Sequence, residues 1–104
     1  LARLCRNLSM TSRMTSPAEI LRNAASVVSE REDTHGDWRV CMDTTAAMWS
    51  LYLGVPVNGK QVALLNALQK IVRDAVGNNN PDDTLDVTGY GSIAAAWDAQ
   101  NTVE

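Results

Sequence analysis

Residues 78–90 decide the fold, and they read Asn-Asn-Asn-Pro-Asp-Asp-Thr-Leu-Asp-Val-Thr-Gly-Tyr. The run of asparagines marks a turn, because asparagine tolerates turn conformations and caps helices. Asn80 is a good N-cap and Pro81 is a good first helical residue, so a helix is predicted to begin at Pro81. The aspartates that follow fall in its first turns, where the helix dipole favours negative charge.

The carboxylates of this segment are predicted to share one face of the helix. Asp82 and Asp86 are four residues apart, and Asp83 and Asp86 are three apart. Like charges at this spacing repel one another unless a cation or a basic side chain lies between them. Lys70 and Arg73 are the nearest upstream candidates, three residues apart near the end of the preceding helix.

Two interpretations of this charge pattern remain open. In the first, Lys70 and Arg73 form structural salt bridges with the acidic turn. In the second, the two basic residues bind a phosphate opposite a magnesium site made by Asp82, Asp83 and Asp86. Magnesium is typically held by one or two carboxylates together with substrate phosphates, so few protein ligands suffice. Structural ion-pair networks produce the same spacing.

The rest of the chain adds three helices to the one that begins at Pro81. The predicted helices cover about residues 17–33, 37–53, 58–76 and 81–99. Ser16 with Glu19 and Asn58 with Gln61 have the spacing of a capping box, and Gly54 is a natural C-cap. No convincing strand and no internal repeat is found. The fold class is therefore all-α, and a compact four-helix bundle is expected.

The helical periodicity also predicts which residues are packed. The helix over residues 58–76 is expected to bury Val62, Leu65, Leu68, Ile71 or Val72, and Ala75 or Val76. Trp38 and Trp49 fall on the packed stripe of the second helix and are interpreted as core or subunit-interface residues. Gly89 and Gly91 each cost nearly 1 kcal/mol relative to alanine inside a helix, so they predict the close approach of another backbone.

Composition excludes several function classes. The chain has 104 residues, of which 45% are hydrophobic and 20% charged, as in an ordinary globular domain. Its net charge of −3 does not favour a nucleic-acid surface. Cys5 and Cys41 form no CxxC pair and indicate reduced thiols in a cytoplasmic protein. No apolar run is long enough to span a membrane.

The first residues differ in composition from the remainder. Residues 1–13 contain three arginines and no acidic residue. They are predicted to be a non-native or disordered leader, and a single helical domain is expected over residues 14–104. The only histidine, His35, lies in a turn beside Gly36. In one interpretation His35 binds a phosphate or a metal ion. In the other it is a surface histidine with no functional role.

From Arg31 to Ile93 the sequence resembles a group of small phage and mobile-element proteins. These look like distant relatives of the MazG-type all-α nucleoside triphosphate pyrophosphohydrolases. The matching segments are Arg31 with His35-Gly36, Trp49-Ser50-Leu51-Tyr52-Leu53-Gly54, Val62-Ala63-Leu64, Lys70-Ile71-Val72-Arg73, and Asp82 with Asp86-Val87-Thr88-Gly89-Tyr90. His35 departs from the group, in which a tyrosine is expected before the glycine.

The resemblance implies a MazG-like, nucleotide-binding protein, with magnesium-dependent pyrophosphohydrolase chemistry if it is an enzyme. Arg31 and His35 join Lys70 and Arg73 as substrate-binding candidates, and no catalytic residue is assigned. MazG-like enzymes hold magnesium with an EExxE motif and a later ExxD motif. Residues 83–86 have the spacing of ExxD with Asp in place of Glu, whereas EExxE has no counterpart in the third helix.

Glu30 and the pair Glu32-Asp33, at the end of the first helix, are the candidates to replace the missing motif. The resemblance also implies a homodimer or homotetramer, with Gly89, Gly91 and Ala95 as the expected contact. The alternative class is a non-enzymatic helical interaction protein of a phage or mobile element. In that class the acidic turn is locked in structural salt bridges.

Overall fold

The computed structural model describes residues 16–101. These residues contain four α-helices and no strand. The helices are α2 (Pro17–His35), α3 (Trp38–Leu53), α4 (Gly59–Val76) and α5 (Pro81–Asn101). The prediction of an all-α helical bundle is confirmed. The predicted leader, residues 1–13, lies outside the described residues. Within residues 16–101, no helix is both long and apolar enough to cross a bilayer.

Local capping explains why the helices begin and end where they do. The Asn58 side chain accepts from the backbone N–H of Gln61, and the Gln61 side chain accepts from the backbone N–H of Asn58, each at 2.9 Å. The predicted capping box of α4 is therefore complete. The Asn80 side chain accepts from the N–H of Asp82 at 3.0 Å and starts α5. Gly54 ends α3 in the left-handed conformation, with φ 73° and ψ 17°.

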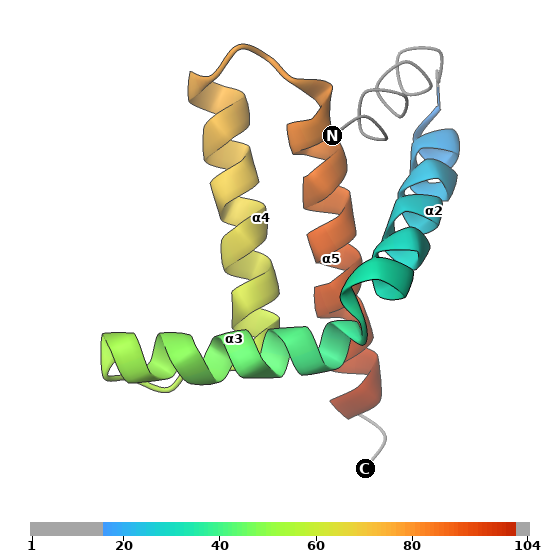
Figure 1. Cartoon of the computed structure of the whole chain (residues 1–104). Helices are drawn as coiled ribbons and strands as arrows, with labels where there is room; N and C mark the ends of the chain where they lie inside the picture. The colour runs from blue at the N-terminus through green and yellow to red at the C-terminus, as the bar shows by residue number, and fades with distance from the viewer. Residues whose placement is uncertain (1–15, 102–104) are drawn as a thin grey trace.

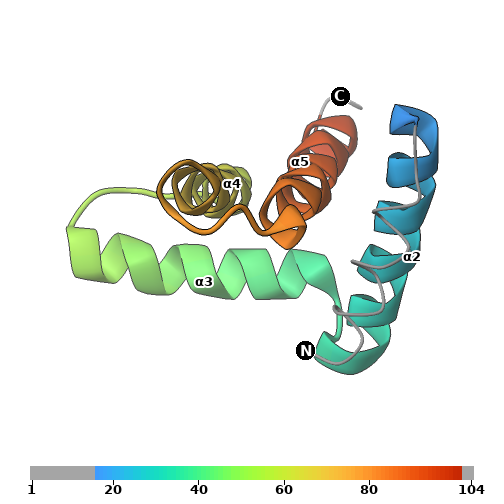
Figure 2. The same cartoon turned by 90° about the horizontal axis from the view of Figure 1, so that it is seen from above.

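Helix α5 occupies the centre of the arrangement. Helices α4 and α5 run antiparallel and side by side, and α2 leans against the other side of α5 (Figures 1 and 2). Helix α3 crosses the end of this layer, and its last turns extend beyond α4 (Figure 1). Side chains of α2 and α4 can therefore both reach α5 from opposite sides.

The core is built mainly from small side chains, and this corrects the predicted stripe on α4. The side of α4 that is buried carries Gly59, Val62, Ala63 and Ala67. Of the large residues expected in the core, Leu65, Leu68, Ile71, Val72 and Val76 are all exposed. Small residues let α4 lie close to α5, and the larger side chains on the opposite side of α4 are left outside.

The close approach of helices occurs at Gly59 rather than at the predicted glycines. A Cβ added to Gly59 would lie 2.4 Å from two ring atoms of Trp97, which is too close to be accommodated without movement. At Gly89 the nearest atom, from Val28, would be at an ordinary 3.8 Å, and at Gly91 nothing lies within 4 Å. Within the chain, neither helix-interior glycine is required for packing.

Trp97 is buried, and its surroundings hold the ring in place. Trp38 meets it edge to face, with ring centroids 6.4 Å apart. The Arg39 guanidinium lies 3.7 Å from the centroid of the Trp97 ring. Such edge-to-face and cation–π contacts each add to the stabilisation that comes from burying the ring. The interpretation of Trp38 as a packing residue is confirmed.

Candidate functional site

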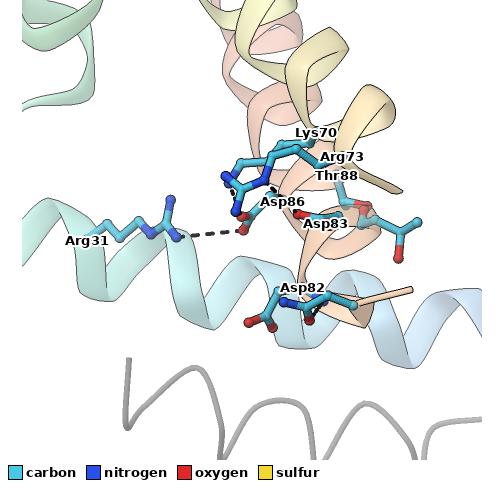
Figure 3. A network of polar contacts seen from close by, with 9 residues as sticks. Arg31, Lys70, Arg73, Asp82, Asp83, Asp86 and Thr88 are labelled. Atoms are coloured by element: carbon cyan, nitrogen blue, oxygen red, sulfur yellow. Dashed lines mark hydrogen bonds and ion pairs between the residues drawn. The ribbon is translucent and has the colours of Figure 1, made fainter. Parts of the chain in front are cut away.

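Five charged residues from three helices meet around the first turns of α5 and form the ionic cluster, which consists of Arg31, Lys70, Arg73, Asp83 and Asp86 (Figure 3). The Lys70 Nζ lies 3.1 Å from Oδ2 of Asp86, and the Arg31 guanidinium lies 3.7 Å from Oδ1 of the same carboxylate. The Arg73 Nε lies 3.8 Å from Oδ1 of Asp83. Asp86 is therefore bridged to α2 and α4, whereas Asp83 is paired with α4 alone.

Helical spacing explains the convergence. Lys70 and Arg73 are one turn apart on α4, and Asp83 and Asp86 are one turn apart on α5, so two parallel rows of charge face each other. The side chains of Asp86 and Lys70 are only 11% and 18% exposed. Water screens a pair at this depth less than a surface pair, so its attraction is stronger.

Asp82, which the sequence suggested together with Asp86 as a salt-bridge partner of Lys70 or Arg73, takes no part in these ion pairs; Asp83 and Asp86 are the paired carboxylates. Figure 3 shows its side chain lying apart from the basic groups. One oxygen, Oδ1, is buried and has no hydrogen-bond partner in the part of the chain that the structure describes. Burial raises the pKa of Asp82 above its ordinary 3.8, and the negative charges of Asp86 and Asp83 raise it further, while Lys70 lowers it.

An apolar cavity of about 150 Å³ adjoins the ionic cluster, between α2, α3 and α5. Its apolar lining consists of Ala24, Val27, Val28, Trp38, Cys41, Met42, Leu85, Gly89, Tyr90 and Ile93. Arg31 and Asp86 belong to both the cavity wall and the cluster. An apolar cavity of roughly this size can hold one aromatic ring. The arrangement thus places a ring-sized apolar space beside Arg31 and Asp86, while Glu32 also lines it and Lys70 contacts Asp86 from outside the cavity.

The remaining predicted site residues, His35 and Glu30, take no part in the three contacts that define the ionic cluster. His35 and Gly36 line the cavity at the end of α2, and within residues 16–101 no ion pair joins His35 to the cluster. The His35 carbonyl accepts from the Cys41 thiol at 3.5 Å. Glu30 is exposed on α2, and its neighbour Arg31 is the α2 residue that contacts Asp86.

The described carboxylates do not form a metal site on their own. Within residues 16–101, no group of three or more His, Cys, Asp or Glu side chains is placed to bind a metal. Asp83 and Asp86 supply two carboxylates, which is the number magnesium commonly takes when substrate phosphates provide the other ligands. Both carboxylates are already paired with basic groups, so they are available only if an anion engages those groups.

The cavity was not predicted from the sequence, although the sequence contains a signal for it. Tyr90 follows Asp86 by four residues on α5, and Val27 precedes Arg31 by four on α2. Residues at this spacing share a face, so an apolar patch next to each charged residue could have been predicted. That the two patches face each other depends on how α2 packs against α5, which helical periodicity does not determine.

Comparison with known proteins gives a family and no activity. A family model described as a domain of unknown function (DUF6378) matches residues 19–98. The match covers most of the chain, including every residue of the ionic cluster, so the chain belongs to this family. No curated protein and no solved structure matches it significantly.

Proposed function

We propose that this DUF6378 domain binds a phosphorylated nucleotide, with the phosphates at the ionic cluster and the base in the adjoining cavity. The observation that carries the proposal is that Arg31 and Asp86 form part of both features. Ligand sites commonly combine an apolar recess with a few convergent polar groups. A nucleotide has the matching chemistry, because an aromatic ring and a phosphate chain lie at its two ends.

The phosphates would compete with the aspartates for the basic side chains. Arg31, Lys70 and Arg73 come from two helices and converge on one place, which suits a chain of phosphates better than a single anion. When phosphates engage these groups, Asp83 and Asp86 lose their partners. A magnesium ion carried by the phosphates would then be held by the two carboxylates, and it would neutralise phosphate charge there.

Hydrolysis of a nucleoside triphosphate to the monophosphate and pyrophosphate is the finer form of the proposal. The spacing of Asp83 and Asp86 supports it, because the two residues are three apart, as are the acidic residues in the second motif of MazG-like enzymes. Release of pyrophosphate from nucleoside triphosphates in the presence of magnesium tests this form. Binding of triphosphates with no pyrophosphate release would restrict the protein to nucleotide binding.

Thermal unfolding with a panel of ligands tests the binding proposal. Nucleoside triphosphates with magnesium should raise Tm, because a ligand that binds only the folded state stabilises it. Tripolyphosphate should raise Tm less, since it cannot fill the cavity, and nucleosides should have the smallest effect. Equal shifts for triphosphates and tripolyphosphate would contradict the placement of the base in the cavity.

The chain offers a matched pair of lysine variants for this experiment. Lys60 and Lys70 both lie on α4 and both pair with an aspartate of α5, Asp98 at 2.9 Å and Asp86 at 3.1 Å. Only Lys70 belongs to the ionic cluster. Lys70→Gln should therefore lose the ligand-induced Tm shift, whereas Lys60→Gln should retain it. The proposal is wrong if both variants respond to triphosphate like the wild type.

A non-enzymatic helical interaction protein is the second candidate. The large apolar side chains exposed on α3 and α4 favour it, and so does the pairing of Asp83 and Asp86 with basic side chains. In this case the ionic cluster only ties α2 and α4 to α5. No phosphate-containing ligand in the panel would then change Tm.

A further inference from the structure

We propose that Gly89 determines which phosphate-containing ligands the site accepts, because its missing side chain keeps open the part of the cavity that takes the base. The inference rests on the proposed function and deepens it. It assigns to one residue the preference for a phosphate chain that carries an aromatic ring over a bare phosphate chain.

Within residues 16–101, neither backbone conformation nor crowding explains why glycine occupies position 89. The residue lies inside α5, where glycine destabilises a helix relative to alanine. The described glycines with a positive φ are Gly36 and Gly54, so the backbone at position 89 suits any residue. A Cβ added there would lie 3.8 Å from Cγ2 of Val28, which is an ordinary contact distance. A costly glycine without a packing role indicates that the space beside it is used.

Gly89 lies at the centre of the side of α5 that faces the cavity. The other α5 residues in the cavity wall are Leu85, Asp86, Tyr90 and Ile93. Leu85 precedes Gly89 by four residues and Ile93 follows it by four, and residues at this spacing share a helical face. A side chain at position 89 would therefore project toward the cavity.

Val28 of α2 lies on the opposite wall of the same cavity. A methyl group at position 89 would touch Val28 and fill the space that the glycine leaves between α5 and α2. The whole cavity measures only about 150 Å³, which suits a single ring. In an apolar pocket, one methylene group more or less changes the binding of a ligand by about 10–200-fold.

The phosphate end of the site does not involve position 89. Lys70 and Arg31 contact Asp86 at 3.1 and 3.7 Å, and Arg73 contacts Asp83 at 3.8 Å. A methyl group at position 89 adds no charge and removes none. A bare polyphosphate, which needs only the basic side chains, should therefore bind equally well to the glycine and the alanine protein. The loss should be confined to ligands that carry a base.

Gly89→Ala and Gly91→Ala form a matched pair for the test. Both residues lie inside α5, but Gly91 does not line the cavity, and two residues along a helix it points in nearly the opposite direction. Without ligand, both variants should have a higher Tm than the wild type, because alanine favours a helix. Calorimetric titration of Gly89→Ala with a nucleoside triphosphate and magnesium should give an affinity at least about tenfold weaker.

Tripolyphosphate should bind Gly89→Ala and the wild type alike, and Gly91→Ala should bind both ligands like the wild type. The inference is overturned if Gly89→Ala retains the triphosphate affinity of the wild type, or if Gly91→Ala loses as much. A lower Tm of ligand-free Gly89→Ala also overturns it, because the glycine would then be needed for packing. Failure of the proposed function is recognised separately, since the wild type itself would then show no preference for triphosphate, and both proposals would fall.

Discussion

Asp86 is the residue on which the candidate site depends most. Its carboxylate contacts Lys70 at 3.1 Å and Arg31 at 3.7 Å, and its side chain is 11% exposed. Helix α5 thus meets both of its neighbours through one side chain. Asp83, which pairs only with the half-exposed Arg73, holds a single neighbour.

Replacing Asp86 by asparagine should destabilise the ligand-free protein by about 1–3 kcal/mol, because Lys70 is left poorly paired in a position that water reaches only in part. Asp98→Asn is the control, since Asp98 is 56% exposed beside Lys60. Loss of that exposed pair should cost less than about 1 kcal/mol. Denaturant unfolding of both variants measures the difference, and equal costs would contradict the special position of Asp86.

Asp82 should make stability depend on pH. A carboxyl group whose pKa is higher in the folded than in the unfolded state disfavours folding when it is ionised. Burial raises the pKa of Asp82 in this way. The ionised group therefore lowers the free energy of unfolding at neutral pH. This penalty disappears as the pH falls through the raised pKa of the folded state.

Asp82→Asn removes that ionisation. The Tm of the variant minus the Tm of the wild type should accordingly be more positive at pH 7 than at pH 4. Thermal unfolding at the two pH values gives the comparison, and Asp98→Asn controls for the loss of one negative charge. A relative Tm that is the same at both pH values would show that Asp82 titrates alike in the folded and unfolded chain.

Among the helices, α4 and α5 are positioned by the contact between Gly59 and Trp97. Gly59→Ala should destabilise the protein by about 1–3 kcal/mol, because the added methyl group overlaps a ring that Trp38 and Arg39 hold in place. Gly91→Ala should instead stabilise it by up to about 1 kcal/mol, since the site is open and alanine favours a helix. Chemical unfolding of the two variants should show shifts of opposite sign.

How far the elements could be predicted from the sequence is clearest in α4. Asn58, Gln61 and Gly77 bound the helix through local interactions, and its limits were therefore predictable. Its buried side was not, because α4 has small residues such as Ala63 on one side and large residues such as Leu68 on the other. Periodicity identifies both stripes. Which of the two stripes is buried depends on how closely α5 packs against α4, and the sequence of α4 alone does not determine that distance.

The candidate site was predictable to a similar extent. The spacing of Lys70 and Arg73 predicted that both would lie near the acidic turn, and the structure places them there. Arg31 reaches Asp86 from a helix that is far away in the sequence. Its contribution depends on the packing of α2, and only the family resemblance pointed to it. That Asp82 lies apart from the ion pairs could not be predicted either, because the spacing along α5 does not determine which carboxylates the side chains of α4 contact.

In the whole molecule, the proposed ligand site is complete within one chain, because α2, α3 and α5 bound the cavity and α2, α4 and α5 supply the ionic cluster. Calorimetric titration should therefore give one nucleotide per chain. A stoichiometry of one nucleotide for two chains would contradict a site that is complete within one chain.

The central claim is that Arg31, Lys70, Arg73 and the adjoining cavity together bind one nucleotide. Amide NMR shifts during titration with a nucleoside triphosphate and magnesium test it most directly, because each residue is observed separately. We predict that the largest shifts fall around Arg31, Lys70 and Asp86 and at the cavity residues Trp38 and Tyr90, with little change near Lys60. Shifts that are absent, or that are confined to residues outside the cluster and the cavity, would contradict the account.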